Sequence, residues 1–512
     1  MGARQLAKLS IEELTASAMG ASEPSFPPPS GVTPGGVDPL GLRQVNFDLM
    51  DKVLPGLNNV ARHIRPFVLV TWACRRAKHL ADASGLPEAR VDDLLDFVDR
   101  IEVIYAWSQF LRAQGADLPG RDVLSALVRG EKYVFGGDGW RRRREARQFS
   151  TAFTSALNYG PALKSLGWVE AHHKYRRLLI ARPQADAALD AFEFLITDRL
   201  EHPAFSEFGA VEVTSLEARQ WADAWADDTV TPAEQKTFAA MLLGDGAPPA
   251  RRAGGALMIA AVQDAMTDET ASVRAAMAGP PSNFTPTVDL TAASEAWRRV
   301  QVRQVFRLAL EALFSWIMAA LEGGPKTTQA LVGLFLTATA DRPELESASA
   351  WLDRRHLETP APTALLARIQ TALQETAGSD LPSSIADALV FCLSEPPAEQ
   401  DKTEPADRLP LWRARREAEA WRQAPTRDFL GHVIDSWVLA QHVYWSVGRG
   451  LADARARGKS ILRLRVVLDE GGWTLAPGAT RPYPVATPDR LQTALSLAKE
   501  CGLLSPAQGR LQ

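Results

Sequence analysis

Clustered arginines are the residues in this sequence best suited to chemistry, and the chemistry that they suit is recognition of phosphate. Five Arg and one Glu lie within the eight residues 140–147, directly after the Gly-rich segment 136–139. Phosphate backbones attract dense positive charge, guanidinium groups add bidentate hydrogen bonds, and an indole ring can stack on a base. The candidate nucleic-acid contacts in this run are Trp140, Arg141, Arg142, Arg143, Arg144 and Arg147.

A structural role for the same run is the alternative interpretation, because charge runs commonly form solvated, salt-bridged helix faces. The preceding segment 90–115 is a predicted helix, and several of its acidic residues could pair with the arginines. These residues are Asp92, Asp93, Asp96 and Asp99.

A second basic cluster lies within residues 449–465, where six basic residues accompany one acidic residue, Asp453. It covers the end of a predicted helix and the first strand of a predicted hairpin, and a basic hairpin beside a helix is a plausible DNA-facing surface. The alternative is favourable charge at a helix C-terminus followed by one polar strand face. The candidate nucleic-acid contacts here are Arg455, Arg457, Lys459, Arg463 and Arg465.

The sequence contains no recognisable reaction centre. It lacks an HExxH pair, paired CxxC motifs, an EF-hand loop and a GxSxG elbow. Neighbouring His172 and His173 would point about 100° apart on a helix, so they do not chelate one ion by themselves. We therefore predict no catalytic residue, no metal and no cofactor. A nuclease site assembled from acidic residues on separate helices is the alternative.

Composition limits the classes to which the chain can belong. It has 512 residues, 46% of them hydrophobic, a formal net charge of −4 and 3 Cys. These values exclude wholesale disorder, a disulfide framework and a general polycation. The N-terminus has no apolar signal region, and the longest apolar run, 306–321, is interrupted by charges and is too short to span a bilayer. We expect a cytoplasmic protein without a membrane partner.

The elements that must position these residues are mainly helical by periodicity. Thr214 with Glu217 and Thr231 with Glu234 predict two capping boxes, and residues 292–321 and 429–458 predict long helices. Tryptophan pairs at helical spacing are predicted to belong to the core rather than to ligand sites. These are Trp221 with Trp225, and Trp437 with Trp445.

The C-terminal part differs from the rest, since strands are predicted at 461–469 and 471–475 before a last helix at 489–504. The fold class is therefore mainly α, a multi-helix assembly with a small α+β, winged-helix-like C-terminal module. The predicted regions are an N-terminal helix and Pro/Gly-rich linker (1–39), an N-terminal helical domain (40–205), a central helical domain (206–345), a charged helical region with a linker (346–425) and the C-terminal module (426–512).

Several short segments spread over the chain carry a family resemblance. They are Asp38-Pro39-Leu40-Gly41-Leu42, Leu54-Pro55-Gly56, Arg62, Arg65-Pro66-Phe67, Trp72, Tyr159-Gly160-Pro161, Leu166-Gly167-Trp168, Thr487-Pro488, Leu491, Leu495 and Cys501-Gly502-Leu503-Leu504. In these residues the chain resembles a group of uncharacterised bacterial proteins that are similar to components of anti-phage defence islands, encoded beside helicases or nucleases. The resemblance implies partner subunits of those kinds and implies no activity.

Three functions follow as hypotheses. The first is a non-catalytic, DNA-contacting and partner-binding component of a multi-protein bacterial anti-phage defence system. The second is a metal-dependent nuclease with a dispersed acidic site, and the third is a protein–protein scaffold. The two arginine clusters favour the first.

Overall fold

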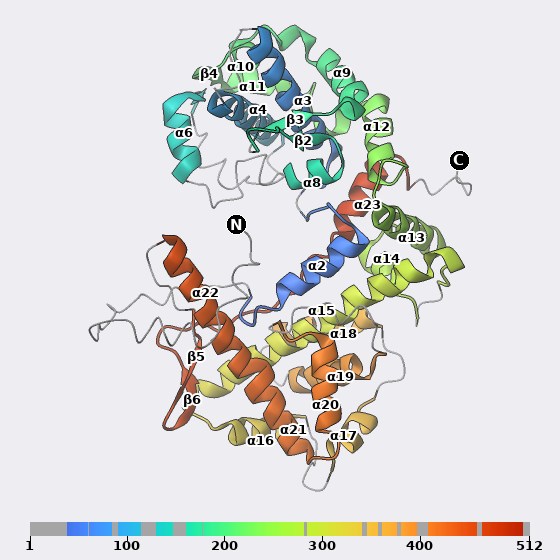
Figure 1. The fold of residues 1–512 in the computed structure, drawn as a ribbon, viewed down its shortest axis with the longest axis vertical. Coiled ribbons are helices and arrows are strands. Elements are labelled where there is room, and N and C mark those ends of the chain that lie inside the picture. The colour runs from blue at the N-terminus through green and yellow to red at the C-terminus, as the bar shows by residue number, and fades with distance from the viewer. Residues whose placement is uncertain are drawn as a thin grey trace. The chain divides into compact units, whose positions relative to one another are not determined.

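A computed structural model describes residues 38–59, 61–83, 91–113, 130–146, 160–176, 178–280, 284–339, 346–356, 361–375, 380–396, 408–457 and 463–504. These residues are mainly helical, as the sequence predicts, and they include three two-stranded antiparallel sheets. Figure 1 shows the order of the elements along the chain.

The chain divides into two compact units that are interleaved in sequence. Unit 1 comprises the described residues of Met1–Leu49, Ala278–Asn283 and Arg298–Thr487, and unit 2 comprises those of Met50–Met277, Phe284–Trp297 and Pro488–Gln512. The predicted regions follow chain order and therefore differ from these units. Turns and Pro-rich stretches show where a chain changes direction, but they do not show which distant segments pack together.

Two helices contribute residues to both units. They are α2 (Arg43–Val53) and α15 (Val288–Leu321). The other elements of unit 1 are α16 (Thr328–Ala338), α17 (Ala348–Arg354), α18 (Pro362–Gln374), α19 (Leu381–Ser394), α20 (Leu411–Ala420), α21 (Thr426–His432), a π-helical stretch (Val433–Ala440), α22 (Gln441–Arg457), β5 (Val466–Asp469) and β6 (Gly472–Leu475).

Unit 2 contains the remaining helices and two of the sheets. Its elements are α3 (Ile64–Ala83), α4 (Val91–Arg112), β1 (Lys132–Phe135), α6 (Gly137–Ala146), α8 (Gly160–Ser165), β2 (Val169–Ala171), β3 (Leu179–Ala181), α9 (Asp186–Leu195), α10 (Pro203–Ser206), β4 (Val211–Thr214), α11 (Ser215–Ala222), α12 (Pro232–Leu242), α13 (Pro249–Ala265), α14 (Thr270–Met277) and α23 (Leu491–Glu500), with short 3₁₀ turns at Pro183–Ala185, Thr197–Arg199 and Asp227–Thr229. The first sheet pairs β1 with β4 and the second pairs β2 with β3.

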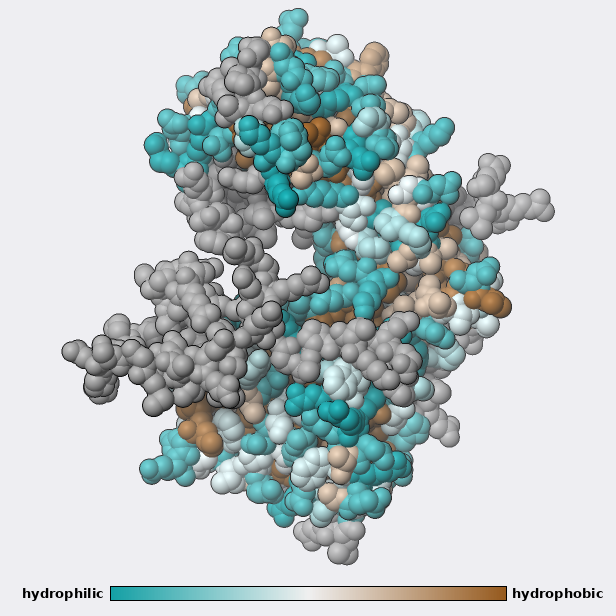
Figure 2. All heavy atoms as spheres, in the orientation of Figure 1, coloured by the Kyte–Doolittle hydropathy of each residue, from teal (hydrophilic) through white to brown (hydrophobic). Residues whose placement is uncertain are grey.

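The core of unit 1 forms around the C-terminal part of α15. Residues 302–321 of this helix are almost all buried, and they share one hydrophobic cluster with side chains of α16 to α21 and with Leu40 and Leu42. Within the described part of the chain, α15 is the helix long and apolar enough to cross a membrane, but 83% of its apolar window is buried inside the protein. Its hydrophobicity is therefore that of a central packing helix. On the face shown in Figure 2, hydrophilic residues cover most of the described surface.

Helix starts in unit 2 follow the local sequence. Thr214 and Glu217 form the predicted capping box at α11, and Thr231 and Glu234 form the one at α12. In each box the threonine hydroxyl accepts a hydrogen bond from the glutamate N–H, and the glutamate carboxylate accepts one from the threonine N–H. Both predictions are confirmed, because this pairing satisfies backbone donors that a helix start leaves open.

The predicted tryptophan core is confirmed for three of its four members. Trp221, Trp225 and Trp437 are buried, and the first two share edge-to-face contacts with Phe205. Trp445 is only half-buried, because it lines a surface pocket.

The C-terminal part contains the predicted long helix and hairpin. Helix α21, the π-helical stretch and α22 are continuous, and β5 pairs with β6 around the Glu470-Gly471 turn. Gly472 has a φ of 110°, and a Cβ there would lie 2.6 Å from the carbonyl oxygen of Lys326, so glycine lets the hairpin pack on the segment after α15. The winged-helix-like module is not confirmed, because the hairpin belongs to unit 1 whereas α23 belongs to unit 2.

A buried ion pair links α3 to α12 in unit 2. The Arg65 guanidinium lies 2.9 Å from the carboxylate of Glu234, and both side chains are fully buried. Burial raises the pKa of Glu234, while the charge of Arg65 opposes that rise. Arg65 therefore has a structural role, since it holds a buried acidic side chain.

Removing one charge of this pair is expected to destabilise the folded protein. Glu234→Gln should lower the free energy of unfolding by about 3–5 kcal/mol, since Arg65 would remain buried without a counter-charge. Glu217→Gln is the matched control, because Glu217 occupies the same capping position beside the partly exposed His202, and we expect a loss of about 1 kcal/mol or less. Urea unfolding followed by tryptophan fluorescence measures both, and equal losses would contradict this role for the pair.

Candidate phosphate-binding site

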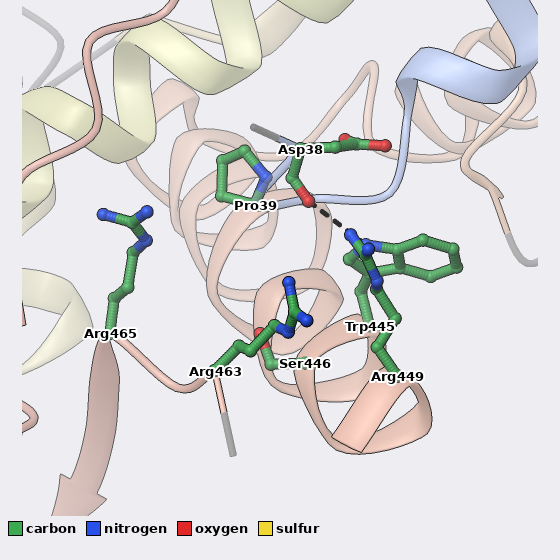
Figure 3. A pocket seen from close by; sticks show the side chains of 7 residues that line it. All are labelled: Asp38, Pro39, Trp445, Ser446, Arg449, Arg463 and Arg465. Carbon is green, nitrogen blue, oxygen red and sulfur yellow. Dashed lines mark hydrogen bonds between the residues drawn. The ribbon is translucent and has the colours of Figure 1, made fainter. Parts of the chain in front are cut away.

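A pocket in unit 1 lies where the start of the described chain meets α22 and the segment before β5. It is lined by Asp38, Pro39, Trp445, Ser446, Arg449, Arg463 and Arg465. The pocket measures about 240 Å³ including its open mouth, and its enclosed part has room for about one water molecule. Figure 3 shows the Arg449 and Arg463 side chains reaching alongside Trp445 toward Asp38 and Pro39.

One wall of the pocket is the segment 38–42, which enters the core at this point. The carboxylate of Asp38 accepts hydrogen bonds from the backbone N–H groups of Leu42 and Arg43, at 2.9 and 3.2 Å, and so caps the start of α2. Leu40 and Leu42 are fully buried in the core of unit 1. The Asp38 carboxylate is therefore engaged with the backbone of α2.

His442 on α22 joins this wall to the strand side of the pocket. Its Nδ1 lies 2.9 Å from the carbonyl oxygen of Pro39, and its Nε2 accepts a hydrogen bond of 2.9 Å from the N–H of Arg465. The imidazole is therefore neutral, with the proton on Nδ1 donated to Pro39. Burial lowers the pKa of His442 to about 4, which keeps both bonds intact at neutral pH.

Trp445 is held by three separate contacts. Its indole N–H donates to the carbonyl oxygen of Asp38 at 3.1 Å (Figure 3), and the guanidinium of Arg408 lies 4.5 Å from the ring centroid. Gly41 has a φ of 74°, and a Cβ there would approach the ring to 2.3 Å, so this position needs glycine. Trp445 thus packs against the chain as a fixed wall.

Three arginines supply the charge of the pocket. Arg449 lies over the Trp445 ring at 5.8 Å, and Arg465 is buried and donates through its guanidinium to the carbonyl oxygen of Thr480. Burial lowers the pKa of Arg465, so water is partly excluded around this cation. Three guanidinium groups around a narrow pocket, one of them desolvated, form a site suited to an anion such as phosphate.

The structure thus brings together part of the second predicted cluster. Arg463 and Arg465 line the pocket, whereas Lys459 and the side chains of Arg455 and Arg457 lie outside the described part of the chain. Sequence reasoning assigned Trp445 to the core and did not identify Asp38 or Pro39 as neighbours of the cluster. Helical spacing offered one usable signal, since Trp445 and Arg449 are four residues apart and therefore share a face of α22.

The first predicted cluster, residues 140–147, does not line this pocket, and its described residues belong to unit 2. The Arg141 guanidinium forms ion pairs with Asp93 and Asp96 on α4, which are two of the acidic partners considered in the structural alternative. Trp140 packs on β1, against Tyr133 and Phe135, so its ring belongs to the packing of unit 2.

The rest of that cluster is described only in part. Arg142 is exposed, while Arg147 and the side chains of Arg143 and Arg144 lie outside the described part of the chain. For Arg141, the observed ion pairs fit the structural alternative.

Metal chemistry gains no support from the described residues. Among them, no group of three or more His, Cys, Asp or Glu side chains is arranged to hold an ion. The ring of His172 stacks near that of His173, and its Nδ1 accepts hydrogen bonds from the backbone N–H groups of Lys174 and Tyr175. That histidine closes a turn between β2 and β3.

One hydroxyl–imidazole–carboxylate arrangement does occur, at the π-helical stretch. Ser436 Oγ lies 3.2 Å from Nδ1 of His432, whose Nε2 lies 2.9 Å from the carboxylate of Glu417. The same carboxylate accepts a hydrogen bond from the Trp437 indole at 2.7 Å. Ser436 sits inside a continuous helix, where backbone N–H groups bond along the helix and are not directed at a reacting carbonyl. We interpret the arrangement as a packing network.

Comparison with known proteins adds no relative: no family model, curated protein or solved structure matches the chain.

Arg141 is expected to contribute to stability through its carboxylate partners. Arg141→Ala should lower the free energy of unfolding by about 1–3 kcal/mol, because it removes the guanidinium that is hydrogen-bonded to the buried Asp96. The matched control is Arg142→Ala, an exposed neighbour on the same helix, for which we expect a change within about 0.5 kcal/mol. Chemical unfolding measures both variants, and an Arg141→Ala protein as stable as its control would contradict this assignment.

His442 predicts a specific pH dependence of stability. Its pKa is about 4 when folded, against about 6.5 unfolded, so the unfolded chain binds more protons between these values. Stability should be full above about pH 6.5 and be lost as the pH falls toward 4, by about 3 kcal/mol in total.

The comparison variant for this prediction is His442→Gln, which removes the titrating group. The difference in unfolding free energy between it and wild type should shrink from pH 7 to pH 4.5, as measured by urea unfolding. Parallel pH profiles for the two proteins would show that His442 does not titrate in this range.

Proposed function

We propose that this chain is a non-catalytic component of a bacterial anti-phage defence system, in which unit 1 contacts DNA phosphates and other surfaces bind partner subunits. The observation that carries the DNA contact is the pocket where Arg449, Arg463 and Arg465 converge. The defence setting and partners such as a helicase or nuclease are proposed from the sequence resemblance, and a cytoplasmic location is proposed from the hydropathy pattern of the sequence.

Arginines are three of the seven residues that line the pocket, and this lining suits an anion such as phosphate. Asp38 is the acidic residue that lines the pocket, and its two carboxylate oxygens accept hydrogen bonds from the backbone N–H groups of Leu42 and Arg43 at the start of α2. Arginine forks match the geometry of phosphate oxygens, and the affinity gained from releasing counterions does not depend on base sequence. The proposal therefore predicts binding that is sensitive to salt and tolerant of sequence.

The proposal does not depend on a winged-helix arrangement. The β5–β6 hairpin is anchored on the segment after α15, where Lys326 and Trp473 exchange backbone hydrogen bonds of 3.0 and 2.9 Å. The basic surface proposed here is the pocket before β5.

Replacing one pocket arginine tests the proposal directly. Arg463→Gln should weaken binding to duplex and single-stranded DNA of unrelated sequences alike, and it should reduce the slope of log affinity against log salt by about 1. The measurement is fluorescence anisotropy with labelled oligonucleotides at several salt concentrations.

The matched control for Arg463 is Arg422→Gln, an exposed arginine of the same unit that pairs with the exposed Glu419. We expect its salt slope to equal that of wild type. An unchanged slope in folded Arg463→Gln protein would remove the pocket from the proposal. If the wild-type protein binds no DNA even at low salt, the scaffold hypothesis is favoured instead.

A further inference from the structure

We infer that the tip of the β2–β3 hairpin in unit 2 is a stacking platform for an unpaired base of a nucleic-acid strand. The platform consists of the rings of His172, His173 and Tyr175 and of the charged side chains of Lys174 and Arg176. It adds a second contact to the one proposed for unit 1, and it uses none of the residues of that pocket. Three features support it: the ring stack, the charge beside the stack and the rigidity of the turn.

Three aromatic rings form a stack at the hairpin tip, and His172 contacts both of the others. Its ring centroid lies 4.3 Å from that of His173 and 5.4 Å from that of Tyr175, at interplanar angles of 31° and 28°. His172 is buried, Tyr175 is half-buried and His173 is exposed. The stack therefore reaches the surface as an exposed, flat ring, which a nucleobase can extend because every base has a π-face.

Two cations flank the exposed ring within the same turn. Lys174 and Arg176 are exposed, and they follow His173 by one and three residues. Within the described part of the chain, neither side chain pairs with a carboxylate, and the carboxylate of Glu170 on β2 lies 3.9 Å from the guanidinium of Arg182. A strand whose base stacks on the exposed ring brings its adjacent phosphates within reach of these two cations, and their attraction does not depend on base sequence.

The turn that carries the rings is fixed before any ligand arrives. Nδ1 of His172 accepts hydrogen bonds from the N–H groups of Lys174 and Tyr175, at 3.2 and 3.1 Å, and the N–H of His172 donates to the carbonyl oxygen of Leu178 at 2.9 Å. The hairpin itself packs on α3 through β3 and on α8 through β2 (Figure 1). A pre-organised site loses less conformational freedom on binding.

The exposed ring selects an unpaired base over a base pair. Bases inside a duplex are already stacked on their neighbours, whereas the bases of a single strand can be splayed out and stacked on aromatic side chains. The two cations would attract the phosphates of either form. The contribution of the ring is therefore the property that distinguishes this platform from a basic surface.

A strand with and without its bases tests the inference. The probes are one single-stranded DNA sequence, the same strand made abasic, and the same sequence as RNA, with binding by the full-length protein measured by fluorescence anisotropy. Wild type should bind the intact strands about tenfold more tightly than the abasic strand, because the abasic strand cannot stack. The tighter binding of DNA or of RNA then identifies which strand supplies the base.

The ring is tested by His173→Ala, which should weaken binding of the intact strand about tenfold and leave binding of the abasic strand unchanged. His173→Tyr keeps a flat ring at this position, so it should retain the preference for the intact strand. The matched control is His79→Ala, because His79 is exposed on α3 of the same unit, and this variant should bind as wild type does.

The cations are tested by Lys174→Gln combined with Arg176→Gln. This variant should weaken binding of the intact and abasic strands alike, and it should reduce the slope of log affinity against log salt by about 1.4, because two phosphate contacts are lost. The matched control is Lys236→Gln combined with Arg219→Gln, which removes the same charge from exposed positions on α12 and α11 and should retain the wild-type slope.

The failure of this inference is distinct from the failure of the proposed function. Equal binding of the intact and abasic strands by wild type would overturn the inference, and so would a base preference that survives His173→Ala in folded protein. Either result leaves the DNA contact of unit 1 in place, since that contact is measured by the salt slope of Arg463→Gln. An unchanged slope in Arg463→Gln would in turn leave the stacking platform in place.

Discussion

The docking of residues 38–42 onto α22 is the constraint on which the arginine pocket depends. Two leucines of this segment enter the core around α15, while His442 and Trp445 bind its backbone carbonyl groups. The hydrophobic burial supplies the stabilisation, and the two polar contacts fix the register of the chain against the helix. Without this segment, Arg449, Arg463 and Arg465 would share a charged surface but would lack the wall that makes it concave.

Guanidinium groups also hold the interior of this protein together, which affects how its arginines should be interpreted. Arg251 is fully buried and donates to the carbonyl oxygens of Pro55, Met241 and Leu242, joining the segment before α3 to the end of α12. Arg100 does the same for Glu207 and Gly209. Burial lowers the pKa of each to about 10, so both remain charged at neutral pH. Carbonyl oxygens stabilise such cations, because each bond to a charged donor is stronger than a neutral one, and the carboxylates of Asp96 and Glu207 add favourable charge near Arg100.

The local elements were largely predictable from the sequence, and the tertiary assembly was not. Capping boxes at Thr214 and Thr231 depend on residues three apart, and the long helices depend on a 3.6-residue period, so both can be recognised within a short window. The interleaving of the two units depends on contacts between segments hundreds of residues apart, such as Asp38 with Trp445. No local pattern carries that information, and for the same reason sequence reasoning identified Arg463 and Arg465 but not the wall opposite them.

The number of arginines in a segment predicts a phosphate site less well than the positions that neighbouring carboxylates take in the fold. Arg141 belongs to the denser cluster, yet Asp93 and Asp96 approach it from the adjacent helix and neutralise it. Arg463 and Arg465 belong to a sparser cluster, but the carboxylate that shares their pocket is turned toward backbone N–H groups. A cation already paired with a carboxylate must give up that partner before it can bind phosphate, which cancels much of the gain. The carboxylate partners of Arg141 on α4 therefore weigh against a phosphate contact at that residue.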